Sequence, residues 1–322
     1  MRVRTALGRS VELLEDRTVP SVAQFVDPHP SAGNDFGAAV VPLSTGNVVV
    51  TAPMDDAGAA DGGAVYLFNG ATGALISTLI GTHAGDHIGD GGVTALTNGN
   101  FVIASPDWHN GTVSGAGAVT WGKGTTGVAG PVSATNSLVG TTANDSIGKV
   151  AALTNGNYVV YSSVWDNGAA TNAGAVTWGS GTTGVAGPVS AANSLVGTTA
   201  NDNVALNGIT ALTNGNYVVA SPFWHNGAAV SAGATTWGSG TTGVAGPVSA
   251  ANSLIGTTAG DLVGSTITAL TNGNYVVASP DWDNGAVANV GAATWGNGAT
   301  GLTGPVTAAN SLIGSATGDL VG

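Results

Sequence analysis

The side chains best suited to ligand chemistry recur in four loops of similar sequence, each built around a tryptophan followed by histidine or aspartate. An aromatic ring flanked by carboxylate and amide groups suits stacking and hydrogen bonding to a sugar. The candidate ligand-binding residues are Trp108, Trp165, Trp224, Trp282, Asp107, Asp166 and Asp283. A tryptophan ring can also bury about 150–250 Å² of surface, and we favour packing between small residues over ligand binding for these rings. A second set of tryptophans lies inside strand-like runs and is assigned to packing: Trp121, Trp178, Trp237 and Trp295.

Catalytic and metal chemistry find no support in the residue pattern. His109 and His225 occupy equivalent loop positions, but Asp166 and Asp283 replace them in the alternate repeats. Equivalent loops of successive repeats would not converge on one ion, and His87 is isolated in the sequence. The chain has no cysteine, no H-E-x-x-H motif and no nucleophile elbow. We therefore expect no enzyme activity, no catalytic residue, no metal site and no cofactor.

An aspartate precedes the first strand-like run of each repeat, and one more stands near the last residue. These are Asp35, Asp86, Asp145, Asp202, Asp261 and Asp319. Aspartate in such a turn can accept backbone N–H groups and hold the turn in place, which is the role we favour. The alternative is a ring of carboxylates around a central channel that binds a cation, which requires several of them to converge.

The charge balance limits the partners. The chain has a formal net charge of −12 and only 7% charged residues, against about 25% in an average soluble domain. After residue 20 its only basic residues are Lys123 and Lys149. Such a surface repels phosphate groups, so we exclude nucleic acids and anionic membranes. No apolar run approaches the roughly 18 residues of a membrane-spanning helix, so we expect no membrane insertion. The expected partner is a surface protein or glycan of unknown identity.

Tandem repetition dominates residues 21–322. The tetrapeptide Thr-Asn-Gly-Asn recurs at intervals of about 58 residues, and the segment GTTGVAGPVSA is identical at 124–134, 181–191 and 240–250. Repetition of this kind indicates one supersecondary unit that stacks on its neighbours. The expected units span about 35–82, 83–140, 141–198, 199–256 and 257–314, with the start of a sixth at 315–322.

Local sequence predicts strands rather than helices. Asn-Gly between two valine-rich runs favours a two-residue type I′ hairpin turn, because both residues tolerate positive φ. Val176 and Trp178 alternate with Thr177, as in a strand that has one buried face. Glycine (53 residues) and proline (12 residues) interrupt every run,. Each unit is therefore expected to be a four-stranded antiparallel meander, which predicts an all-β β-propeller of five such blades that is either closed or open and truncated.

The repeat resembles the FG-GAP repeat of the integrin α-chain propeller. The first unit carries the resemblance, with Asp35-Phe36-Gly37, then Asn47 to Pro53 (NVVVTAP) and Gly63 to Phe68 (GAVYLF). Calcium-binding members of that family have an aspartate-rich loop between their first two strands. Here that loop is Thr-Asn-Gly-Asn, which has no carboxylate to bind calcium. The resemblance therefore implies an adhesive propeller without the family's calcium sites.

The first twenty residues differ from the rest of the chain. They hold both glutamates and four of the six basic residues, and VELLEDRTVPS resembles the LEDR-type leader of exported planctomycete proteins. This resemblance implies an N-terminal targeting segment at residues 1–20 and an extracellular or cell-surface location. The alternative is a short amphipathic helix that ends near Pro20.

These observations leave two functions. The first is a non-enzymatic structural or adhesive module at the cell surface, in which identical loops make weak contacts that add through avidity. The second is lectin-like glycan binding through the tryptophan loops. Tryptophan rings buried between repeats favour the first function, whereas a concave pocket beside each ring favours the second.

Overall fold

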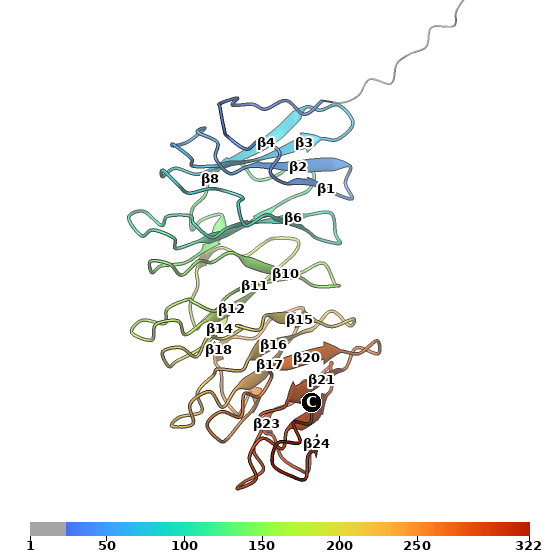
Figure 1. Ribbon diagram of the computed structural model, residues 1–322. Helices are drawn as coiled ribbons and strands as arrows, with labels where there is room; N and C mark the ends of the chain where they lie inside the picture. Colours follow the sequence, from blue (N-terminus) through green and yellow to red (C-terminus); the bar gives the residue numbers. More distant parts are fainter. Residues whose placement is uncertain (1–23) are drawn as a thin grey trace, which may run out of the picture.

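The computed structural model describes residues 24–322, so the leader expected at 1–20 lies outside the described residues. The prediction of an all-β chain is confirmed for this range, which contains strands, turns and loops without a helix. The strands form five sheets. The sheets stack in chain order, so the two ends of the described chain lie at opposite ends of an open array (Figure 1). Accordingly, residues 24–322 offer no helix of the length and apolarity needed to cross a bilayer.

Each sheet takes four antiparallel strands from one repeat. The first sheet uses β1 (Val40–Pro42), β2 (Asn47–Ala52), β3 (Ala64–Asn69) and β4 (Leu75–Ile80). The second uses β5 (Val93–Ala95), β6 (Phe101–Ser105), β7 (Ala118–Gly122) and β9 (Ser137–Val139). The third uses β10 (Lys149–Ala152), β11 (Tyr158–Ser162), β12 (Ala175–Gly179) and β14 (Ser194–Val196). The fourth uses β15 (Ile209–Ala211), β16 (Tyr217–Ser221), β17 (Ala234–Gly238) and β19 (Ser253–Ile255). The fifth uses β20 (Thr266–Ala269), β21 (Tyr275–Ser279), β22 (Ala292–Gly296) and β24 (Ser311–Ile313).

A fifth strand joins each of the first four sheets from the following repeat. These short Gly-Pro strands are β8 (Gly130–Pro131), β13 (Gly187–Pro188), β18 (Gly246–Pro247) and β23 (Gly304–Pro305). Each lies parallel to the last strand of the preceding repeat, as β18 does to β14, where Leu195 pairs with Gly246 and Val196 with Pro247. Proline is tolerated there because the strand is at the sheet edge. The expectation of four-stranded blades is therefore wrong for four of the five sheets, which contain a fifth strand donated by the following repeat. The sheets form an open stack, so the closed alternative for the propeller is also wrong.

The hairpin between the first two strands of a repeat also differs from the prediction. In the second repeat Gly99 N–H donates to Leu96 O at 3.0 Å, and Leu96 N–H donates to Asn100 O at 2.8 Å. Gly99 has φ +86°, whereas Asn98 is not among the residues with positive φ. The loop thus has three residues with glycine in the left-handed position, and the two-residue type I′ turn is wrong. Asn98 instead directs its amide group to the next repeat, where it donates to Gly181 O at 2.8 Å.

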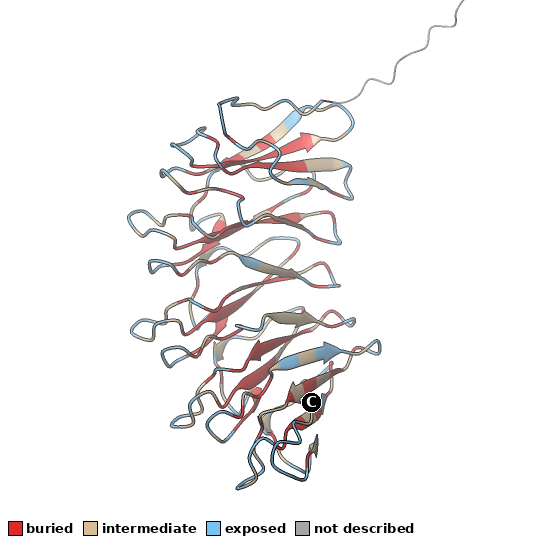
Figure 2. Ribbon diagram, viewed as in Figure 1, coloured by how far each residue is buried: buried red, intermediate tan, exposed pale blue. Residues whose placement is uncertain are grey.

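The hydrophobic core is divided into layers between successive sheets. Side chains point to opposite faces of the sheet at successive positions of a strand, so each strand contributes to two core layers. Val159 of β11 packs toward the fourth sheet, and Val160 packs toward the second. The buried interior of the strands and the exposed loops recur at every level of the stack (Figure 2). Such an array gains its stability from contacts between neighbours, because one sheet alone cannot bury both of its faces.

The two ends of the stack are different. The outer face of the first sheet is covered by Phe25 and Phe36, which pack on Tyr66 and Phe68. At the other end, residues 315–322 pack on the fifth sheet, where Val321 N–H donates to Val290 O at 3.1 Å. The outer face of the fifth sheet has no covering layer among the described residues.

Candidate functional site

The tryptophans of the four candidate loops are buried. Each ring packs in the core layer between its own sheet and the preceding one. The exposed fractions are 4% for Trp108, 3% for Trp165, 5% for Trp224 and 4% for Trp282. A ring enclosed in this way offers no face for a sugar to stack on, so these positions contribute packing between repeats.

The aspartates of the same loops have different settings. Asp166 accepts a hydrogen bond from Asn172 N–H at 2.7 Å, and Asp283 accepts one from Asn289 N–H at 2.7 Å. Both carboxylates therefore fix the shape of their own loop. Asp107 instead has a half-exposed side chain that points toward a histidine.

The repeated turn aspartates are fully buried acceptors in all four connections between the five repeats. In the third connection, Asp202 Oδ2 accepts Thr198 N–H and Thr199 N–H, each at 2.8 Å, while Oδ1 accepts His225 N–H at 3.0 Å. The other three are Asp86, Asp145 and Asp261. Each carboxylate thus joins the turn that leaves one repeat to the tryptophan loop of the next. Their expected role in holding the turn is confirmed for these four, whereas Asp35 is exposed and its backbone carbonyl, not its carboxylate, accepts Ala38 N–H. The stacked arrangement has no central channel around which the carboxylates would form a ring.

Burial raises the pKa of two of these carboxyls, Asp145 and Asp261, above the ordinary range, although their backbone N–H donors oppose the shift. The negative charges of Asp166 and Asp283 add to the increase,. In the alternate repeats a histidine takes that place. His225 Nδ1 lies 3.0 Å from Asp202 Oδ1.

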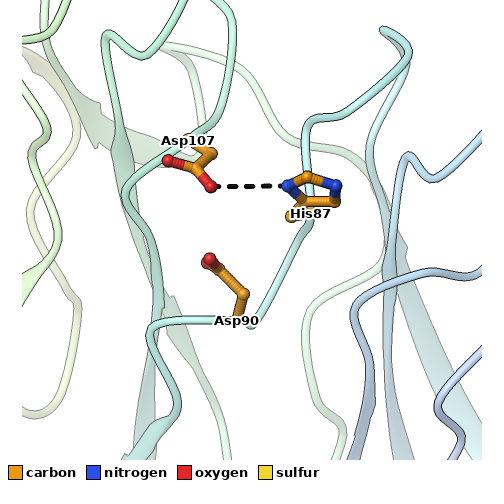
Figure 3. Close-up of side chains that lie close together, drawn as sticks. All are labelled: His87, Asp90 and Asp107. Atoms are coloured by element: carbon orange, nitrogen blue, oxygen red, sulfur yellow. Dashed lines mark hydrogen bonds and ion pairs between the residues drawn. The ribbon is translucent and has the colours of Figure 1, made fainter.

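The side chains of His87, Asp90 and Asp107 lie close together, and this combination of residues occurs in one repeat. His87 Nδ1 lies 3.4 Å from Asp107 Oδ2, and Asp90 completes the group (Figure 3). The three potential ligand atoms lie within 4.8 Å of one another, and no other set of three such side chains does so among residues 24–322. Partial desolvation, reinforced by the charge of Asp107, raises the pKa of Asp90 to about 6.

In the sequence His87 is isolated, because it forms no recognisable motif with Asp90 or Asp107. Val164 and Phe223 replace Asp107 in the third and fourth repeats. The sequence feature that could have identified this group is therefore that its residues differ from those at the equivalent positions of the third and fourth repeats. An imidazole and two carboxylates are a ligand set that divalent metals such as zinc accept.

Shallow grooves lie where neighbouring repeats meet, beside tryptophans that were assigned only to packing. One groove of about 280 Å³ is lined by Trp121, Asn136, Thr183 and Val185. A second of about 250 Å³ is lined by Trp237, Asn252, Thr300 and Leu302. Each ring is partly exposed and is held by its indole N–H, as Trp121 Nε1 donates to Gly181 O at 3.0 Å. The aromatic surface available to a ligand therefore belongs to the third strand of the repeat and not to the predicted loops.

Comparison with known proteins identifies the repeat. The sequence matches the family described as "Repeat of unknown function (DUF5650)" at residues 42–90, 95–149, 152–206, 211–265 and 269–322. No curated protein matches the chain. Among solved structures it is similar to a putative 6-phosphogluconolactonase from Bacteroides uniformis, with 13% identity and a TM-score of 0.31 over 88% of this chain and 87% of that one. A likeness of this size carries no argument about fold or activity.

Proposed function

Because the chain belongs to the DUF5650 family of repeats of unknown function, we propose from its own geometry that it is a non-enzymatic structural and adhesive module. The observation that supports this role is that the loop tryptophans and the turn aspartates are buried between repeats. They join the sheets into one extended array. The LEDR-type leader and the short motifs shared with FG-GAP repeats support an extracellular or cell-surface location.

An array of this kind acts by presenting the same surface several times. The most uniform exposed feature is the Thr-Thr pair after the third strand, at 125–126, 182–183 and 241–242. Contacts that are weak at one loop add when several loops engage one surface at the same time. The proposed partner is therefore a surface that carries many copies of one protein or glycan.

Adhesion of coated beads tests this proposal. Beads that carry the chain are applied under flow to intact cells of the organism that produces it. Thr182→Gln alone is expected to reduce bead retention slightly, whereas the triple variant with Thr125→Gln and Thr241→Gln is expected to abolish it. Thr112→Gln, at an exposed position between the second and third strands of its repeat, is the control. Retention of the triple variant at the wild-type level would refute multivalent adhesion through these loops.

The grooves beside Trp121 and Trp237 support glycan binding as a second candidate function. Each combines a partly exposed indole ring with asparagine and threonine side chains, which suits stacking and hydrogen bonding to a sugar. A glycan array tests this candidate. The variant Thr183→Tyr with Thr300→Tyr fills both grooves and should remove any glycan signal, and a signal that persists in this variant would exclude the grooves as the binding sites.

A further inference from the structure

The group formed by His87, Asp90 and Asp107 places two carboxylates together without a basic residue to balance them. The three potential ligand atoms lie within 4.8 Å of one another, and both carboxylates face the same space beside the imidazole (Figure 3). Among residues 24–322, no lysine or arginine forms an ion pair with either carboxylate. Carboxylates this close repel each other, and a cation between them removes the repulsion. This part of the surface therefore favours a bound cation.

The distance between His87 and Asp107 fits a shared metal ion better than a hydrogen bond. His87 Nδ1 and Asp107 Oδ2 are 3.4 Å apart, whereas a charge-assisted N–H···O bond is about 2.7–2.9 Å long. Two ligand atoms that each lie about 2.1 Å from a tetrahedral zinc ion are about 3.4 Å from each other. Asp90 has an exposed side chain on the same side of the group, so a rotation of its carboxylate brings an oxygen to that ion.

Two of the three residues come from separate loops and are held by fully buried neighbours. His87 lies between Asp86 and Ile88, both of which are 0% exposed. Asp107 directly precedes Trp108, whose ring packs in the core. The backbone on both sides of the group is therefore fixed before an ion binds, which reduces the conformational entropy that binding costs.

The later repeats have the same backbone at this place but not the same side chains. The equivalents of His87 share its left-handed conformation, with φ of +45° or +46°: Ser146, Asn203 and Leu262. The equivalents of Asp90 carry no carboxylate: Lys149, Leu206 and Ser265. In the fifth repeat Asp281 occupies the position of Asp107, but the other two ligands are missing there. The complete ligand set is thus a property of the second repeat.

We propose that His87, Asp90 and Asp107 bind one divalent transition-metal ion, for which zinc is the probe. An imidazole nitrogen and two carboxylate oxygens are ligands that zinc accepts, and the fourth tetrahedral position is open to water on the exposed side of the group. Calcium is the less suitable ion, because it takes six to eight oxygen ligands. The expectation of no metal site considered the repeated histidines of the tryptophan loops, and these residues lie outside that repetition.

The bound ion links two loops at the junction between the first and second sheets. His87 and Asp90 lie in the connection between β4 and β5, and Asp107 lies in the loop between β6 and β7. His87 N–H also donates to Asp61 O of the first repeat at 3.3 Å. Because the ligands converge only in the folded chain, zinc stabilises this junction by mass action. Metal binding is separate from the proposed adhesive role, since the threonine loops of the bead experiment contain none of these residues.

Zinc titration of the full chain, after EDTA has removed any metal, tests the proposal. Calorimetry is expected to show one zinc ion bound per chain, and zinc should raise the thermal midpoint, whereas calcium at the same concentration should not. His87→Asn and Asp107→Asn should each weaken zinc binding at least about tenfold, which corresponds to about 1.4 kcal/mol. Both variants should keep the fold, because asparagine occupies the position of His87 in the fourth repeat and the side chain of Asp107 is half-exposed.

Two control variants separate this site from unspecific binding. Asp281→Asn changes the equivalent of Asp107 in the fifth repeat, and His29→Asn removes an exposed histidine outside the group. Both are expected to bind zinc as tightly as the wild type. The proposal would be overturned by absence of zinc binding, by tighter binding of calcium than of zinc, or by equal zinc affinity in the wild type and His87→Asn, which would assign the ion to other residues.

Discussion

Replacing Gly243 by alanine tests whether the contact between repeats is as close as the structure has it. Gly243 has φ +74°, and a Cβ there would lie 2.5 Å from Trp178 Cβ, which is part of strand β12 of the preceding repeat. The strand itself would have to move, because a Cβ atom cannot escape by a rotamer change. Left-handed alanine costs about 1–2 kcal/mol, and overpacking adds about 1–3 kcal/mol. The expected loss in the free energy of unfolding is therefore about 2–5 kcal/mol.

Gly246→Ala provides the matched control for this experiment. Gly246 is in the same segment with φ +92°, but a Cβ there meets no atom within 4 Å. Only the backbone cost of about 1–2 kcal/mol applies to it. Urea unfolding followed by tryptophan fluorescence measures both variants. Equal losses at the two positions would refute the close packing of Gly243 on Trp178.

Three further experiments test other features of the array. Trp224→Ala removes a buried ring and should lower the free energy of unfolding by about 3–5 kcal/mol, whereas Trp295→Ala, at an exposed ring, should change it little; similar losses would contradict the assigned burial. Asp202→Asn replaces one acceptor oxygen by an N–H donor that faces backbone N–H groups and should cost about 1–3 kcal/mol in urea unfolding. Asp319→Asn should cost less, because its carboxylate accepts the N–H groups of Ser315 and Ala316 at an exposed position, and the reverse order would be inconsistent with this role. Because the pKa of Asp90 is raised to about 6, the folded state binds its proton more tightly than the unfolded state, so stability declines as pH rises from about 4 to 6. Asp90→Asn should therefore raise the thermal midpoint at pH 7 and leave it unchanged at pH 4, and a lowered midpoint at pH 7 would exclude the shift.

The sequence predicts the strands well where a local pattern determines them. Alternation around Thr177 and the valine-rich run after Asn157 correspond to β12 and β11. The role of the turn aspartates follows from the ability of a short carboxylate to accept nearby N–H groups. The packing of the loop tryptophans follows from ring size in a chain of small residues.

The parts that were missed depend on contacts between repeats. The run PVSAANSLV at 188–196 reads as one strand, but Gly187–Pro188 pairs with the preceding sheet while Ser194–Val196 pairs with its own. No local signal separates the two, since either piece can form strand hydrogen bonds. The grouping of His87 with Asp107 likewise arises from loops that are brought together only by folding.

Hydrogen exchange of the valine amides next to the Gly-Pro strands tests the central claim, that each repeat after the first donates a strand to the sheet before it. Val189 and Val248 donate their N–H groups to Val139 O and Val196 O of the preceding repeats. The account predicts that both amides are protected as strongly as those of the central strand β11, because they open only when neighbouring repeats separate. If both amides exchange their hydrogen as fast as amides in the exposed loop around Gly227, the repeats do not donate these strands to the preceding sheets.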